Sequence, residues 1–407
     1  MSLQTRSKKS SRFTLPDTTG TMQARFLLIF AVASLTIIGL IMVYSASSID
    51  QIYKTGSALT VISKQVPFAI AGAFLCYGVA KFVPFDMWEG RLAWISFAFC
   101  MALLILVAAI GTSALGAQRW VNIGPVSLQP SEFAKIAYCI IAARITGRFI
   151  NNECTITSYA LYMVLAIVLP LGVLYVTQND LGTTAIIMVG IIAVLLEGGI
   201  PLKVVVSILI VGIFFAALSS ILTPFRSNRW SFINPWEDPD GVSYQLVHSL
   251  YAFADGGIFG VGLGNSYEKY QYLPEAQTDF VYSILGEEWG LIGAVLVLVL
   301  YLIFAYAGLK IARQASSHLG AMVAGSLTTM VVFQAFLNIG SVLGVAPTTG
   351  KPLPFLSNGG SSLLSSFLIV GIILSVSYQS KRSDVHEDRR RNLRLVTNDN
   401  FRSVRKR

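Results

Sequence analysis

Four carboxylates stand out in the stretch LPEAQTDFVYSILGEEWG, Leu273 to Gly290, of a chain in which only 13% of residues are charged. They are Glu275, Asp279, Glu287 and Glu288, and a long apolar run follows them. Acidic side chains are costly beside lipid, so inside an apolar segment they usually face a wet, protein-lined interior and indicate function. Crowding and burial raise the pKa of such a carboxylate while a helix start lowers it, and the balance suits a general base near neutral pH.

Pro274 is the residue at which we expect the helix of this stretch to begin, because proline suits the first helical position. Glu275 and Asp279 would then lie one turn apart on the same face, where Glu275 can tune Asp279. Glu287 and Glu288 lie deeper, and we weigh structural helix contacts against a part in the site. This stretch predicts Asp279 as the base.

A second polar group lies in GAQRWVNIGPVSLQPSEFAK, where Arg119 precedes Glu132 and Lys135 at the opening of an apolar run. Residues three apart share a helix face, so Glu132 and Lys135 can pair. The pair is either a simple orienting contact or part of a cationic pocket. In that pocket Arg119 and Lys135 would donate to an anionic headgroup, with the arginine able to do so bidentately.

Two further outer segments carry polar or flexible residues. Asp180 in QNDLGT is either the N-cap of the next helix or a functional polar contact, and the two roles are compatible. The segment Tyr244 to Phe253 has apolar residues at helical spacing, which indicates an amphipathic helix at the outer leaflet. The glycines of GGIFGVGLG then favour a tight turn or a close approach by a ligand, since no strand precedes them as a dinucleotide site requires.

The elements that position these residues are membrane helices. The chain is 54% hydrophobic with a mean hydropathy of +0.65, which predicts an all-α, polytopic membrane protein. Ten apolar runs are long enough to cross a bilayer, near residues 26–44, 66–83, 92–110, 133–150, 159–176, 181–196, 202–222, 281–309, 321–345 and 361–379. A large outer loop, residues 223–280, separates the seventh and eighth. The Pro- and Gly-rich segment Ala346 to Ser362 is either a surface turn or a re-entrant segment lining a cavity.

Basic residues indicate the orientation of the chain. Lys and Arg gather on the side that holds both termini, which predicts cytoplasmic ends. We therefore divide the chain into a basic N-terminal tail, 1–25, a ten-helix domain, 26–380, and a basic C-terminal tail, 381–407, with both tails disordered. Much of the net charge of +9 is tail charge, which favours contact with anionic membrane lipids and excludes nucleic acid.

The motifs GAQRW, LQPSEFAK, QNDLGT, NPWEDPDGVSYQLVHSL, GLGNSYEKYQYLPEAQTDF and PLPFLSNGGSSLL resemble the SEDS family of shape, elongation, division and sporulation proteins. The resemblance runs from about Phe26 to Tyr378. It is strongest to the division and sporulation types, FtsW and SpoVE, rather than to the elongation type, RodA. Asn179 and Asn358 depart from the family, which usually has proline and tyrosine at these two positions.

The resemblance implies a peptidoglycan glycosyltransferase that polymerises lipid II on the outer face of the bacterial cytoplasmic membrane, with a role at the division septum. Asp279 matches the family's essential aspartate, and Arg119, Glu132, Lys135 and Asp180 match other sensitive positions. An inverting attack by an acceptor 4-hydroxyl would expel polyprenyl pyrophosphate. The implied partners are lipid II, a class B penicillin-binding protein with transpeptidase activity, and other divisome proteins.

No cofactor is required by this chemistry, and the sequence has no metal-ligand cluster, although Mg²⁺ or Mn²⁺ could assist the pyrophosphate. Two other functions compete with a polymerase. A lipid II flippase would need access from both faces in turn, whereas the polar motifs gather on the outer side. A noncatalytic division scaffold would act through the tails and have no need of Asp279.

Overall fold

The computed structural model describes residues 18–379, apart from 111, 115–116, 124–125 and 223–227. The predicted tails therefore lie largely outside the described residues. The elements are α1 (Thr18–Thr55), α2 (Ile62–Phe82), α3 (Phe85–Glu89), α4 (Arg91–Ile110), β1 (Thr112–Ala114), β2 (Ala117–Ile123), β3 (Val126–Leu128), α5 (Pro130–Ile150), α6 (Ile156–Met163), η1 (Val164–Val168), α7 (Leu169–Gln178), α8 (Leu181–Glu197), α9 (Leu202–Leu222), η2 (Asn228–Ile233), η3 (Pro235–Glu237), α11 (Tyr244–Gly256), α12 (Val281–Arg313) and α13 (His318–Val342). A last helix, Gly360–Gln379, follows them.

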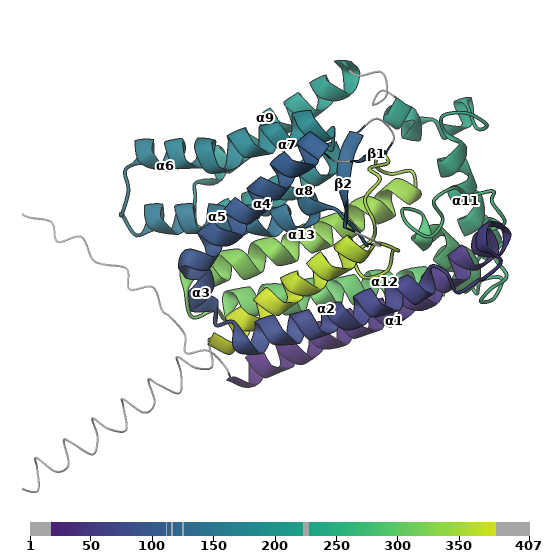
Figure 1. Ribbon diagram of the computed structural model, residues 1–407, viewed down its shortest axis with the longest axis horizontal. Helices are drawn as coiled ribbons and strands as arrows, with labels where there is room; N and C mark the ends of the chain where they lie inside the picture. Colours follow the sequence, from purple (N-terminus) through teal and green to yellow (C-terminus); the bar gives the residue numbers. More distant parts are fainter. Residues whose placement is uncertain (1–17, 111, 115–116, 124–125, 223–227, 380–407) are drawn as a thin grey trace, which may run out of the picture.

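Helices occupy all ten places at which the sequence predicts a membrane span, and the fold is that of a polytopic membrane protein (Figure 1). Six of them are long and apolar enough to cross a bilayer, and Arg91–Val107, Leu181–Glu197 and Leu202–Phe215 are shorter apolar helices. The fifth span is α6, η1 and α7 in succession. Its η1 is a π-helical turn that ends two residues before Pro170, whose missing N–H disturbs the regular helical bonding.

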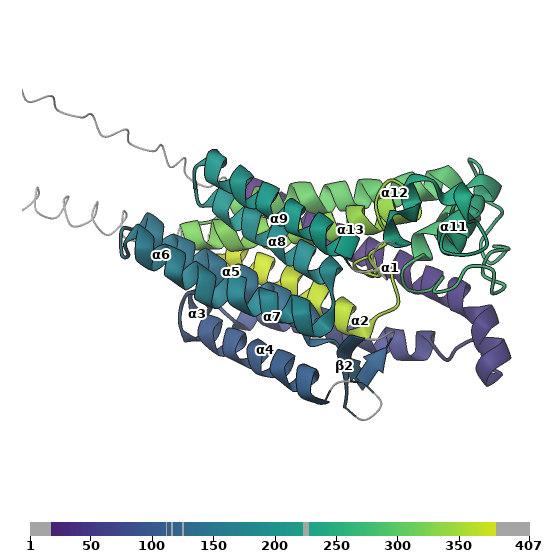
Figure 2. The same ribbon diagram turned by 90° about the horizontal axis from the view of Figure 1, so that it is seen from above.

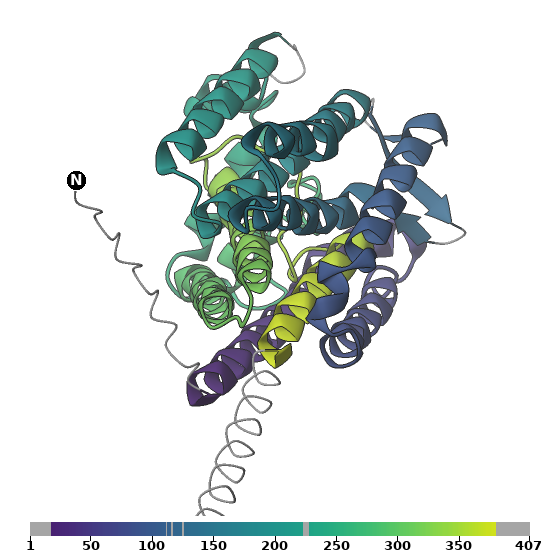
Figure 3. The same cartoon turned by 90° about the vertical axis from the view of Figure 1, so that its left-hand side faces the viewer.

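The described chain starts and finishes at the same end of the bundle. The beginning of α1 and the end of the last helix lie together, opposite α11 and the small sheet (Figure 1). Helix α1 begins at Thr18, earlier than the predicted span at 26. The centre of the bundle is built from α12, α13, α8 and α5, which pack against one another, with α1 against α12 (Figures 2 and 3).

The Pro- and Gly-rich segment before the last helix is re-entrant. Leu353, Phe355 and Leu356 are buried within it, and the hydroxyl of Tyr301, well inside α12, donates to the carbonyl of Pro354. A Cβ at Gly39 of α1 would clash with the main chain of Phe355, so the glycine is what lets α1 approach. Irregular backbone at this depth is tolerated because protein, not lipid, surrounds it.

Helix α12 is broken at Gly290, which has φ of 65° and ψ of −164°. The glycine-rich segment of the large outer loop fills this break. Val261 and Gly262 donate their N–H groups to the carbonyls of Glu287 and Glu288 at 2.9 and 3.1 Å, and Leu291 donates to the carbonyl of Gly257 at 2.9 Å. These bonds satisfy the backbone groups that the break exposes. Of the two roles expected for these glycines, a tight turn or the close approach of a ligand, the contacts show a tight turn packed against α12.

On the outer side, one predicted element is present and one unpredicted element is added. The predicted amphipathic helix is present as α11. The loop before α5, by contrast, contains an antiparallel sheet, β1-β2-β3, that the sequence did not indicate. Its strands are only three to seven residues long, too short for a clear alternating pattern.

Candidate functional site

Asp279 lies just before α12 and not within it. The predicted helix start at Pro274 is wrong, because residues 274–280 form consecutive turns and Glu275 has a positive φ of 56°. The N–H of Asn358 donates to the carbonyl of Gln277 at 2.9 Å and ties these turns to the re-entrant segment. This tertiary contact competes with the helical bonding that the local sequence favours. Glu275 is exposed and accepts from the hydroxyl of Thr278 at 2.8 Å.

The half-buried carboxylate of Asp279 faces the re-entrant segment. A Cβ built on Gly350 would lie 3.6 Å from Asp279 Oδ2, so the acid lies directly against this glycine. Gly350 has a φ of 64°, a conformation in which a side chain is disfavoured. A side chain at this position would be strained by the backbone and would touch the carboxylate, so the glycine leaves this side of Asp279 uncovered by a side chain of its own.

Two side-chain amides of α13 hold the backbone at this point. Asn338 Nδ2 donates to the carbonyls of Asp279 at 2.8 Å and Lys351 at 2.9 Å. Gln334, one turn earlier on the same face, donates from Nε2 to the carbonyl of Pro352 at 2.9 Å. Asn338 thus joins the segment that carries Asp279 to the segment that carries Lys351.

Lys351 and Asp180 form a buried ion pair next to Asp279. Lys351 Nζ lies 2.6 Å from Asp180 Oδ2, and both side chains are about 2–3% exposed. Asp180 is also the N-cap of α8, as predicted, because its Oδ1 accepts from the N–H of Thr183 at 3.0 Å. Burial raises the pKa of Asp180, but Lys351 and Arg119 outweigh it and lower the pKa to about 2. The acid is therefore ionised at any pH near neutrality.

Arg119 projects from β2 onto the α7–α8 turn. Its Nε and Nη2 donate to the carbonyls of Gln178 and Asn179, each at 2.9 Å. Asn179 adopts a left-handed conformation with φ of 48°, which proline cannot reach because its ring fixes φ near −65°. The asparagine in place of the family's usual proline thus suits the turn that Arg119 holds.

Glu132 and Lys135 form the predicted pair, and the structure buries it deeply. Lys135 Nζ lies 2.7 Å from Glu132 Oε2 and 2.9 Å from Gln334 Oε1, and its side chain is 3% exposed. The hydroxyl of Ser365 in the last helix donates to the same Glu132 oxygen at 3.2 Å. Lys135 therefore links α5 to Gln334, which in turn holds the re-entrant segment.

Several buried polar atoms around these residues have no hydrogen-bond partner among the described residues. They are Gln277 Oε1, Asn338 Oδ1, Thr349 Oγ1 and both amide atoms of Gln178. Buried polar groups in proteins are nearly always bonded, so such a concentration indicates water or a ligand. All belong to segments that meet at Asp279, Lys351 or Arg119.

Glu287 and Glu288 bond residues of the large outer loop and make none of the contacts described around Asp279, Lys351 and Arg119. Glu287 accepts from the hydroxyl of Ser266 and the N–H of Tyr267, and Glu288 is paired with buried Lys269 at 3.0 Å. Ser45 of α1 donates to the same oxygen of Glu288. The sequence left open whether these two acids make structural contacts or take part in the site. Their contacts in the structure are structural.

Sequence reasoning missed Lys351, Asn338 and Gln334. Lys351 was visible as a rare basic residue of an outer segment, and the two amides as polar side chains four apart in an apolar run. Their partners, however, are far away along the chain, and Asp180 and Lys351 are 171 positions apart. Only the packed helices bring them together.

Comparison with known proteins decides the family. The model of the FtsW/RodA/SpoVE family, described as cell cycle protein, matches residues 25–382. The chain belongs to this family. Among its relatives in the family is stage V sporulation protein E of Bacillus subtilis, 36% identical over 87% of this chain and 97% of that protein. The probable peptidoglycan glycosyltransferase FtsW of Geobacter metallireducens is also 36% identical, over 87% of this chain and 94% of its own length.

Solved structures of the FtsW/RodA/SpoVE family share the fold. One belongs to a study of how a peptidoglycan synthase complex coordinates polymerization and crosslinking; it matches with a TM-score of 0.69 and 27% identity, covering 87% of this chain and 97% of that one. The rod shape determining protein RodA of Thermus thermophilus matches with a TM-score of 0.65 and 25% identity, over 87% and 96% of the two chains.

Proposed function

We propose that this protein is a peptidoglycan glycosyltransferase that polymerises lipid II on the outer face of the cytoplasmic membrane. The observation that carries the proposal is the convergence at Asp279. A half-buried carboxylate lies beside an open glycine, next to the buried Lys351–Asp180 pair and to polar atoms that lack protein partners. The names of relatives in the family support the reaction class.

Asp279 acts as the general base in this scheme. It takes the proton from the acceptor 4-hydroxyl as that oxygen bonds to the anomeric carbon of the donor. The bond from that carbon to the pyrophosphate oxygen breaks on the opposite side, which inverts the configuration. One carboxylate suffices because pyrophosphate leaves without protonation by a dedicated acid, unlike the two-carboxylate arrangement usual in glycosidases.

Positive charge near the site stabilises the departing pyrophosphate. Arg119 is the residue proposed to touch it, since its guanidinium is only half-buried at the α7–α8 turn. Lys135 acts through its neighbours, because Glu132 and Gln334 already accept from its ammonium. Asp180 positions Lys351. Glu275 is proposed to contact the substrate from the exposed turn before Asp279. A divalent cation, Mg²⁺ or Mn²⁺, is not required and would add positive charge at the pyrophosphate when present.

The finer proposal places the protein in septal cell division with a class B penicillin-binding protein and other divisome proteins. Both termini are cytoplasmic in this proposal, so α11 and Asp279 face outward and meet lipid II after its translocation. The described ends of the chain lie together at the end of the bundle opposite α11 (Figure 1), which supports placing both termini on one side of the membrane.

The test is reconstitution with purified lipid II. The protein is placed in liposomes with and without a cognate class B penicillin-binding protein, and glycan products are separated on a gel. In parallel, fluorescent lipid II supplied to one leaflet reports its movement to the other. Glycan ladders without lipid II movement are expected. Movement without any polymer would replace the proposal with a flippase, and the absence of both would favour a scaffold.

A further inference from the structure

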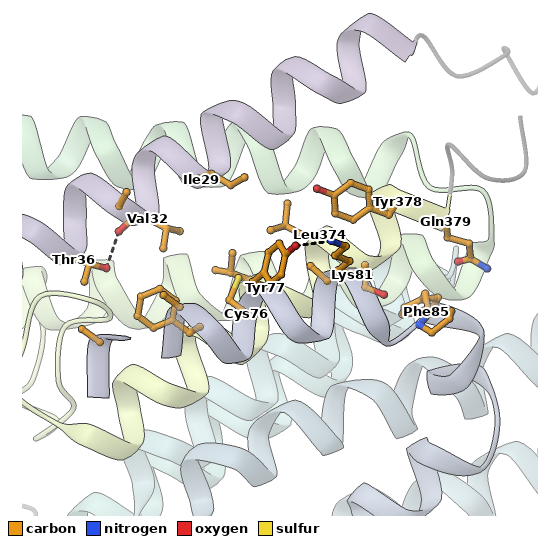
Figure 4. Close-up of a pocket in the computed structure, with 18 of the residues that line it drawn as sticks. Ile29, Val32, Thr36, Cys76, Tyr77, Lys81, Phe85, Leu374, Tyr378 and Gln379 are labelled. Carbon is orange, nitrogen blue, oxygen red and sulfur yellow. Dashed lines mark hydrogen bonds between the residues drawn. The ribbon is translucent and has the colours of Figure 1, made fainter. Parts of the chain in front are cut away.

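A second concave site lies far from Asp279, at the end of the bundle where the chain starts and finishes. It is a groove of about 1440 Å³ between α1, α2 and the last helix (Figure 4). Its walls are apolar, with Val32 of α1, Ala73 of α2 and Leu374 of the last helix among the lining residues. Rim residues such as Ile37 and Ile70 are more than half exposed, so the groove opens to the surroundings of the bundle.

The groove has charged side chains at one end only. Lys81 at the end of α2, and Asp86 and Glu89 in α3, line this end together with Ser317. Lys81 is exposed and donates to the hydroxyl of Tyr77 at 2.7 Å (Figure 4). Asp86 accepts from Gln379, and Glu89 accepts from Ser317 at 3.1 Å. Two arginines lie beside this end: Arg25 stacks on the ring of Tyr378, which lines the groove, and Arg144 donates to the carbonyls of Glu89 and Gly90. Lysine, arginine and carboxylate charges thus meet where the apolar walls end.

This polarity matches one class of lipid. An apolar trough with a charged mouth suits acyl chains attached to a headgroup, and a headgroup is bound best when each of its charges meets an opposite one. Lys81 provides a partner for a phosphate, whereas Asp86 and Glu89 provide partners for an ammonium. Arg144 already lies beside Glu89, so a phosphate-only headgroup such as phosphatidylglycerol would leave chiefly Asp86 without a cationic group of the lipid.

Glu89 adds a separate reason for an ammonium. Burial and the charge of Asp86 raise the pKa of its carboxyl group, and they outweigh the hydrogen bond from Ser317 and the charge of Arg144, which lower it. An ammonium close by would favour the ionised form of Glu89. We infer that the groove between α1, α2 and the last helix binds one phospholipid with a phosphate and an ammonium in its headgroup, as in phosphatidylethanolamine. In the proposed orientation this lipid belongs to the inner leaflet.

The inference is tested by counting bound lipids. Purified full-length protein is equilibrated with equal amounts of dioleoyl phosphatidylethanolamine and dioleoyl phosphatidylglycerol, and native mass spectrometry measures which one remains bound. Phosphatidylethanolamine is expected to be retained in preference. Ala73→Phe should fill the groove and remove it, whereas Ala71→Phe, on an exposed part of the same helix, should not. Ala33→Phe fills the groove from the α1 wall and serves if Ala73→Phe fails to fold.

The headgroup is tested separately. Lys81→Ala should weaken retention about tenfold, the equivalent of one charge-assisted contact. Lys203→Ala, which removes an exposed lysine near the start of α9, is the matched control and should change nothing. Equal retention of both lipids, or equal losses in Ala73→Phe and Ala71→Phe, would overturn the inference. So would capture of a transmembrane helix, instead of lipid, by a photoreactive residue introduced at Ile37.

Discussion

Asn338 holds Asp279 in place: its side-chain amide donates to the carbonyl of Asp279 at 2.8 Å and, with the same nitrogen, to that of Lys351 at 2.9 Å. Asp279 lies before the first residue of α12, so helical hydrogen bonds do not fix the backbone of the proposed base. Its position depends on α13 and on the re-entrant segment. Substitutions of the residues that hold this backbone, Asn338 first among them, can therefore test how the position of Asp279 affects the reaction.

Removing this amide should impair catalysis more than stability. Asn338→Ala loses both contacts and frees the turn that carries Asp279, and a small displacement of a reacting group can cost about 100-fold in rate. We expect kcat for glycan synthesis to fall by about that factor with a smaller change in KM. Thr329→Val removes a polar group of the same helix that bonds only within it, and should behave as wild type. Equal losses in both variants would contradict the role of Asn338.

The Lys351–Asp180 pair should behave as a unit. Lys351→Met leaves a buried, ionised aspartate without its lysine, and breaking a buried pair in this way costs about 3–5 kcal/mol. Asp180→Asn combined with Lys351→Met removes both charges and should recover much of that loss. Thermal unfolding in detergent of the two single variants and the double variant measures the coupling. Additive losses would show that the pair is not coupled.

The same pair gives a defined dependence of stability on pH. The folded pKa of Asp180 is about 2, below the value near 3.9 expected in an unfolded chain. Its contribution, on the order of 2 kcal/mol, is then present in full above about pH 4 and is lost as pH falls toward 2. The difference in unfolding midpoint between wild type and the Asp180→Asn/Lys351→Met double variant should be constant from pH 5 to 8 and shrink below 4. A difference that shrinks near neutrality would contradict the assignment.

Glu288 should matter for stability and not for the reaction. Glu288→Gln leaves Lys269 buried without a charged partner, which weakens the link between the outer loop, α12 and Ser45. We expect a loss of about 3 kcal/mol in unfolding free energy. At a temperature where the variant is folded, glycan synthesis per folded molecule should be close to wild type. A large loss of activity without loss of stability would indicate that Glu288 takes part in the reaction.

Local sequence was sufficient wherever the interaction is short-range. The Glu132–Lys135 pair spans three residues and the Asp180 cap belongs to its own helix, so both were predicted and both are present. The apolar runs likewise located the helices. The start of α12 was misplaced because a contact from Asn358, about 80 residues away, holds the preceding turns. Lys351 could not be assigned for the same reason, since its partner lies on a different helix.

The most direct test of the central claim compares two acid-to-amide changes on the outer side. Asp279→Asn removes the proposed base, and Asp50→Asn removes a carboxylate of α1 that accepts from its neighbour Gln51 and pairs with exposed Lys54. Both proteins are given lipid II with the class B partner, and unfolding temperature is recorded alongside the glycan ladder. We predict that Asp279→Asn unfolds within a few degrees of wild type and makes no ladder, while Asp50→Asn makes a normal one. A normal ladder from folded Asp279→Asn would contradict the assignment of Asp279 as the base.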